Sequence, residues 1–154
     1  MSQTPATSMA EETAARLDYV LQLADTSLVL GQRLGELLGH APTIEEDLGM
    51  ANTSLDLIGQ ARLLLALASE IEGQDRSEDQ LAFLRTESDF RNLVLVEQPN
   101  GDFAQIIARQ FLLDAYQLTL YEKLQQSSDQ RLAAIATRTD VDLANGTPEV
   151  GESV

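Results

Sequence analysis

The sequence contains no cysteine, no tryptophan and only one histidine among its 154 residues. Without cysteine, the chain has no disulfide bonds, no thiolate zinc site and no cysteine nucleophile. Aromatic residues make up only 5% of the chain, β-branched runs are short, and Leu, Ala, Gln and Glu dominate. This composition favours helix throughout. We therefore expect an all-α protein with a single domain, because 154 residues are too few for two well-packed cores.

Basic residues are also scarce: 10 Lys and Arg stand against 25 Asp and Glu, which gives a formal net charge of -15. Such a chain repels nucleic acid and anionic membranes at long range, so we expect neither as a partner. No apolar run reaches the roughly 20 residues that span a bilayer, and the first residues do not resemble a secretion signal. We expect a soluble, cytoplasmic protein.

Capping residues and glycines divide the chain into helices. We expect a first helix from about Thr13 to Gly39, a second from Thr43 to about Glu72, and a short third from Ser77 to Arg85. An irregular passage follows, in which Val-Leu-Val at 94–96 has the composition of an extended segment. The second and third helices each begin with a polar cap that is followed three residues later by Glu or Gln. The first begins with Thr in a run of helix formers. Gly31 and Gly35 lie on the apolar stripe of the first helix, where they indicate close helix packing.

Two more helices follow the turn at Asn100-Gly101. The first has Asp102 as its cap, with Gln105 three residues on, and extends to about Gln126. Ser127 and Gln130 begin the next, which we expect to end near Arg138.

The long helices at 43–72 and 102–126 are apolar almost all round, but each carries one narrow polar stripe. These stripes have two readings. Each stripe can face water, as polar side chains generally do, or the two can face each other inside a bundle, where ferritin-like proteins place metal ligands. The sequence leaves both open. The stripe residues are Asn52, Asp56 and Gln60 on one helix and Gln110, Asp114, Gln117 and Tyr121 on the other.

A two-iron bundle needs Glu-x-x-His turns on two of its helices. The only histidine, His40, has Leu37 three residues before it and lies in a predicted loop, so we expect a cap or surface role. A site built from carboxylates alone would have to use Asp25, Asp56 and Asp114, but Asp25 falls on a polar face that water solvates. We therefore predict no catalytic, cofactor-binding or metal-ligating residue.

Arg62 lies among the apolar residues of the helix at 43–72, where we expect a buried or interface ion pair. The chain has no Gly-x-Ser-x-Gly turn, no glycine-rich phosphate loop, and no histidine placed to activate a serine.

Three strings are distinctive beyond generic helix composition: DLIGQAR at 56–62, DFRNLVLVEQPNGDFAQ at 89–105 and ARQFLLDAY at 108–116. With their flanking residues, from about Leu21 to Thr137, they resemble the PaaC family. The resemblance implies a ferritin-like helical bundle that serves as the non-catalytic structural subunit of the phenylacetyl-CoA 1,2-epoxidase, a multicomponent monooxygenase of aerobic phenylacetate degradation. It implies a PaaA-like catalytic subunit, which carries the di-iron site, as the partner.

The same resemblance implies that Leu57 and Gln60 replace a Glu-x-x-His pair of the catalytic relative, and that Asp114 lies near the corresponding ligand region. We therefore expect these three positions to resemble a lost metal site, with no cofactor and no activity of the chain alone.

The carboxy-terminal end departs from the family, whose members continue into a histidine-bearing fourth helix. From this we expect a truncated chain with three parts: a disordered leader at 1–12, a ferritin-like helical domain at 13–138 and an irregular tail at 139–154. Two alternatives remain: a carboxylate-bound metal oxidase of ferritin-like type, and a helical self-association module that forms homodimers.

Overall fold

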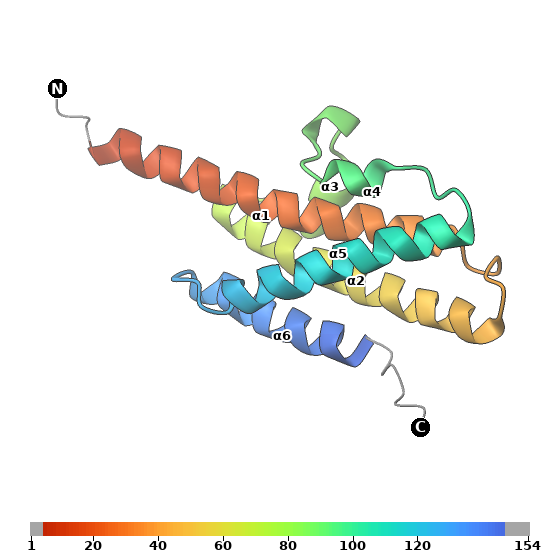
Figure 1. The fold of residues 1–154 in the computed structure, drawn as a ribbon. Helices are drawn as coiled ribbons and strands as arrows, with labels where there is room; N and C mark the ends of the chain where they lie inside the picture. Colours follow the sequence, from red (N-terminus) through yellow and green to blue (C-terminus); the bar gives the residue numbers. More distant parts are fainter. Residues whose placement is uncertain (1–4, 147–154) are drawn as a thin grey trace.

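The computed structural model describes residues 5–146, and within them the side chains of residues 8–140. This part of the chain is helical and holds no strand, which confirms the all-α prediction. Four long helices form a bundle consistent with the ferritin-like fold (Figure 1). No helix in the described part is long and apolar enough to cross a membrane. The long helices are α1 (Pro5–Gly35), α2 (Ile44–Glu72), α5 (Phe103–Leu124) and α6 (Gln130–Gly146).

The first two helices form an antiparallel pair that packs along most of its length (Figure 1). The absence of a side chain at Gly31 permits this approach: a Cβ there would lie 3.0 Å from Ile58 Cγ1 and 3.2 Å from the Ser54 carbonyl oxygen. The hydroxyl of Ser54 donates a hydrogen bond of 2.7 Å to the Gly31 carbonyl oxygen. The close packing predicted from the glycine stripe is therefore confirmed at Gly31.

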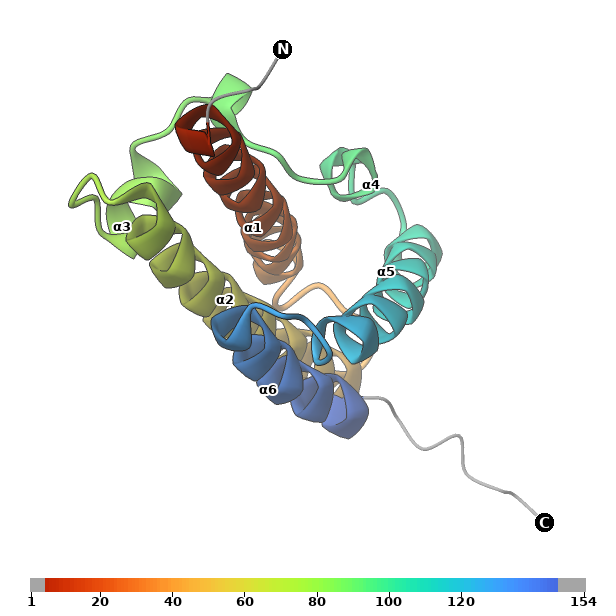
Figure 2. The same cartoon turned by 90° about the vertical axis from the view of Figure 1, so that its left-hand side faces the viewer.

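Viewed along the bundle, α1, α2, α6 and α5 follow one another around its axis (Figure 2). Helix α6 lies beside both α2 and α5. Its 17 residues make it much shorter than α2, which has 29.

Two apolar clusters form the core. One lies where α1 and α2 meet α3 (Glu78–Phe83) and the start of α6, and the other lies toward the opposite end, where α4 (Val94–Glu97) and α5 cover the same pair. The first cluster is built on Val20, Leu23, Ala24, Leu28, Ala61, Leu64, Leu65, Leu67, Ala68, Leu81 and Leu132. The second is built on Leu30, Leu34, Met50, Leu57, Val96, Ile106 and Leu113.

Helix α1 begins at Pro5, so the predicted start at Thr13 is wrong, and residues 5–12 are not a disordered leader. Proline is tolerated in a first helical turn, and the Ala, Met and Glu residues that follow are strong helix formers. Residues 1–4 lie outside the described part. The helix ends at Gly35 rather than Gly39, which instead adopts a left-handed φ of 85° in the following turn.

Helix α6 continues past Arg138 to Gly146, so the predicted irregular tail begins too early; residues 147–154 lie outside the described part. Its cap is Asp129, whose Oδ1 accepts hydrogen bonds from the backbone amides of Arg131 and Leu132. The predicted cap, Ser127, instead accepts a bond from the Asp129 amide.

The other predicted caps hold. Ser77 with Gln80 and Asp102 with Gln105 form reciprocal capping boxes. Thr43 accepts from the Glu46 amide as the N-cap of α2, and α2 ends at Glu72 as predicted. The passage between α3 and α5 contains a 3-10 turn, η1 (Glu87–Asp89), and α4, so Val-Leu-Val is one helical turn rather than an extended segment.

Replacing Gly31 with Ala should lower the free energy of unfolding by about 1–3 kcal/mol, because the new methyl group meets the fixed backbone of Ser54. Gly49→Ala is the matched control, since nothing lies within 4 Å of its Cβ position. That change should raise stability by about 0.5–1 kcal/mol through helix propensity alone. Urea denaturation followed by circular dichroism measures both, and equal effects would contradict the packing argument.

Candidate functional site

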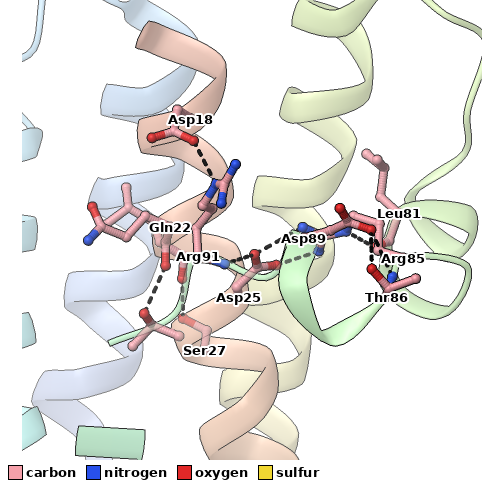
Figure 3. Close-up of polar contacts among 11 residues, drawn as sticks. Asp18, Gln22, Asp25, Ser27, Leu81, Arg85, Thr86, Asp89 and Arg91 are labelled. Atoms are coloured by element: carbon pink, nitrogen blue, oxygen red, sulfur yellow. Dashed lines mark hydrogen bonds and ion pairs between the residues drawn. The ribbon is translucent and has the colours of Figure 1, made fainter. Parts of the chain in front are cut away.

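The most deeply buried charge among the described residues is the carboxylate of Asp25, which is 0% exposed in the middle of α1. It accepts two hydrogen bonds from the guanidinium of Arg85, one of them 3.0 Å from Nη1. The backbone amide of Arg91 donates a third, of 2.9 Å (Figure 3). The prediction that water solvates Asp25 is therefore wrong: its carboxylate faces the segment after α3, whereas Asp18 and Gln22 of the same polar face are exposed.

Further contacts fasten this segment to α1. The Arg85 guanidinium lies over the ring of Phe90, 4.4 Å from its centroid, in a cation–π contact. Nε of Arg91 donates to Asp18 at 2.9 Å (Figure 3), and the Leu93 amide donates to the Thr26 hydroxyl at 3.1 Å. The cluster positions the backbone of residues 85–93.

A second polar region joins α1, α2 and α5. Gln60 of α2 is 7% exposed and donates a hydrogen bond to the hydroxyl of Tyr121 of α5, which is 1% exposed. Gln117, one turn earlier on α5, is 2% exposed, and its Oε1 has no hydrogen-bond partner within the described part. A pocket of about 20 Å³ opens beside it, lined partly by Tyr19, Thr26 and Gln117, which is close to the space that one water molecule needs.

The two readings of the polar stripes each hold for part of the bundle. Gln60, Gln117 and Tyr121 face the interior, as the metal-protein comparison suggested, whereas Asn52 and Asp56 are exposed. The stripe on α2 therefore turns from water at its start to the core at its centre.

Burial raises the pKa of Tyr121 well above its ordinary value of 10.0, because the phenolate would lose its hydration; hydrogen bonding with Gln60 and Ser27 opposes this only in part. Burial also raises the pKa of Tyr19, with a smaller contribution from Tyr116. Neither tyrosine is activated toward ionisation, so the region has the character of a structural polar core rather than an acid–base centre.

The three positions predicted to resemble a lost metal site have different surroundings in the structure. Leu57 is 3% exposed in the second apolar cluster, and Gln60 donates a hydrogen bond to Tyr121. Asp114 of α5 is half-buried and accepts a hydrogen bond of 2.7 Å from Gln110 of its own helix. Burial raises the pKa of Asp114, and the Gln110 bond lowers it to a smaller extent.

The structure does not bring together the carboxylates of the metal-oxidase alternative. Asp25 is paired with Arg85, Asp56 is exposed, and Asp114 bonds within α5. Among the described side chains, no group of three or more His, Asp or Glu residues is placed to hold a metal ion. His40 is exposed, with Nδ1 3.2 Å from the Leu38 carbonyl oxygen.

Arg62 forms an ion pair, but at the surface. Its Nε lies 3.5 Å from Oε1 of Glu78, and its side chain is 75% exposed. The predicted ion pair is therefore present, and it is not buried within the chain; the interface alternative stays a prediction.

The model of the family described as "Phenylacetic acid catabolic protein", which covers PaaA and PaaC, matches residues 1–143. The chain belongs to this family. It is also 54% identical, over 120 residues, to the C subunit of 1,2-phenylacetyl-CoA epoxidase from Escherichia coli (strain K12). That match covers 78% of this chain and 48% of the relative, so the chain spans about half the length of the curated relative it matches.

Sequence reasoning about this member of the family missed the Asp25–Arg85 pair and the Gln60–Tyr121 bond. The partners are separated by 60 and 61 residues, and no local pattern indicates which residues so far apart will meet. The only available signal was a polar side chain within a largely apolar helix, which does not identify its partner.

Asp25→Ala should lower the free energy of unfolding by about 3–5 kcal/mol, because it leaves the buried Arg85 without a counter-charge. Asp18→Ala, which removes an ion pair whose side chains are 65% and 51% exposed, should cost at most about 1 kcal/mol. Urea denaturation measures both, with Asp25→Asn as a milder variant if the alanine variant fails to fold. A cost at Asp25 no larger than at Asp18 would contradict the arrangement.

Tyr121→Phe should cost about 1–3 kcal/mol at neutral pH, since Gln60 loses its acceptor in the core. Because the folded-state pKa of Tyr121 is raised, its contribution is complete below pH 10 and is lost as the pH rises through the folded-state pKa. Between about pH 9 and 11 the free energy of unfolding should therefore fall less in the variant than in the wild type. The difference in slope corresponds to the release of about one proton when the wild type unfolds. Tyr116→Phe, at an exposed tyrosine, is the control and should change stability by at most about 0.5 kcal/mol.

Proposed function

We propose that this chain acts as a non-catalytic structural subunit of a phenylacetyl-CoA epoxidase, and that it supports a PaaA-like di-iron catalytic subunit in aerobic phenylacetate breakdown. The family match and the 54% identity to a subunit of such an epoxidase support this assignment. The residues of the core also support it, since Leu57 and Gln60 are a hydrocarbon and an amide, and neither is a ligand that holds iron.

The observation that carries a docking role is the outer face of α5. From Phe103 to Tyr121 the helix has only two charged residues, Arg109 and Asp114, and both are turned inward: Arg109 is 6% exposed and Asp114 is half-buried. A chain with 35 charged residues thus presents one long helix face without any. The exposed side chains of this face include Ile107, Phe111, Leu112 and Leu118.

Charge depletion around exposed aromatic and aliphatic groups is typical of the centre of a protein–protein interface. Phe111 is 71% exposed, the most of this group, so it is the natural anchor for a pocket on the partner. The inner face of α5 is held by fixed contacts: Arg109 donates to the Gln98 carbonyl at 3.2 Å and to Asn100 at 2.8 Å. The apolar face is therefore presented by a rigid helix, which reduces the entropy lost on binding.

Co-expression with the catalytic PaaA subunit should give a complex that co-elutes in size-exclusion chromatography. Phe111→Glu should weaken that complex about tenfold or more, because it places a charge in the desolvated centre of the interface. Phe83→Glu on α3 is the matched control, since Phe83 is also 71% exposed and lies off this face. A wild-type chain that stays monomeric and does not bind the catalytic subunit would refute the proposal.

A further inference from the structure

The pocket beside Gln117 lies between α1 and α5, whose backbones stay farther apart than those of α1 and α2 (Figure 2). Side chains of both helices fill most of the space between them and leave a volume of about 20 Å³. A polar cavity holds a water molecule once its volume exceeds about 10–15 Å³. The pocket is therefore large enough for one water molecule and too small for a larger ligand.

One atom at this pocket needs a hydrogen-bond donor. Gln117 is 2% exposed, and its Oε1 has no hydrogen-bond partner among the described residues. A buried acceptor without a donor destabilises the fold, because it has lost its hydration and gained nothing in return. Buried polar atoms in proteins are therefore almost always bonded, either to another protein group or to an ordered water molecule.

Two hydroxyl groups of the lining are already committed to other partners. The Thr26 hydroxyl donates to a backbone carbonyl oxygen at 2.8 Å and accepts from a backbone amide at 3.1 Å, so it retains only a lone pair. The Tyr121 hydroxyl accepts from Gln60 and is also hydrogen-bonded to Ser27. The Ser27 hydroxyl donates to a backbone carbonyl oxygen at 3.1 Å, so the hydrogen between these two groups comes from Tyr121. Neither Thr26 nor Tyr121 has a hydrogen left for Gln117.

The remaining hydroxyl groups of the lining belong to Tyr19 of α1 and Tyr116 of α5, which are 38% and 48% exposed. Tyr19 is the more buried of the two. Burial raises its pKa, and Tyr116 adds to the rise, so the Tyr19 hydroxyl keeps its proton and remains a donor. The lining thus holds a donor on α1 and an unpartnered acceptor on α5, and these two groups are not bonded to each other.

The chemistry of the lining favours a neutral occupant. No acidic and no basic residue lines the pocket. A cation bound there would lose its hydration without gaining a carboxylate, which is unfavourable even in a chain with a net charge of -15. Water is neutral, fits the volume, and both donates and accepts hydrogen bonds.

We propose that this pocket is a binding site for one water molecule, which donates to Gln117 Oε1, accepts from the Tyr19 hydroxyl and so joins α5 to α1. Its second hydrogen is directed to the free lone pair of Thr26 Oγ1. Three partners are typical of a buried water molecule. The inference does not rest on the proposed function, because it concerns only the interior of this chain.

A crystal structure of the full chain, at a resolution that shows ordered water, tests the site directly. One water molecule should lie about 2.7–3.2 Å from Gln117 Oε1, with a second hydrogen bond to the Tyr19 hydroxyl. A pocket without electron density, a cation in it, or a protein group bonded directly to Gln117 Oε1 would overturn the proposal.

Urea denaturation of the Gln117→Met variant tests the site in solution. With water in the pocket, the variant should unfold at a lower urea concentration than the wild type, because it loses a satisfied hydrogen bond in the core. Without water, the midpoint should rise, since the substitution removes an unpaired buried acceptor. Gln32→Met, at an exposed position of α1, is the control and should leave the midpoint unchanged. An unchanged or higher midpoint for Gln117→Met would count against the water site.

A double variant tests the bridge between the two helices. Tyr19→Phe should lower the urea midpoint of the wild type but have little further effect in the Gln117→Met background, because the same bridge is then already lost. Tyr116→Phe is the matched control, and its small effect should be the same in both backgrounds. Additive effects of Tyr19→Phe and Gln117→Met would show that no shared water joins the two side chains, and would reject the proposal.

Discussion

The buried carboxylate of Asp25 is the contact on which the arrangement of the bundle depends. Since it is fully withdrawn from water, it needs the Arg85 guanidinium and the Arg91 amide to offset its lost hydration. Both donors belong to the passage between α3 and α5, so satisfying one charge fixes the backbone that crosses α1. Burying a charge costs stability even when it is paired. What it gains is specificity, because the bonds to Asp25 are directional and fix the position of the passage on α1.

That fixed passage in turn determines where α5 begins. Arg33 of α1 donates to the carbonyl oxygen of Glu97 at 3.1 Å, and Arg109 of α5 donates to Gln98 and Asn100. A series of polar contacts therefore runs from the centre of α1 through the passage to the first half of α5. Apolar packing alone allows a helix to slide or rotate, because it is non-directional. These hydrogen bonds determine which face of α5 turns inward, and so which face is left for a partner.

Local features of the fold followed from the sequence, and features that depend on distant residues did not. The caps at Ser77 and Asp102 and the end of α2 were predicted correctly because each depends on residues within one helical turn. Asp25, which was predicted on a solvated face, proved buried, and Arg62, which lies among apolar residues, forms its ion pair at the surface of the chain. Helical periodicity identifies a face, but which neighbour covers that face is decided by tertiary packing.

The same reasoning explains why the bundle suits binding rather than catalysis in the role we propose. The polar groups at the centre of its core include Gln60 and Tyr121, which bond to each other across the bundle. Its acidic residues lie mostly outside the apolar face of α5, where they oppose indiscriminate contact without blocking a complementary partner.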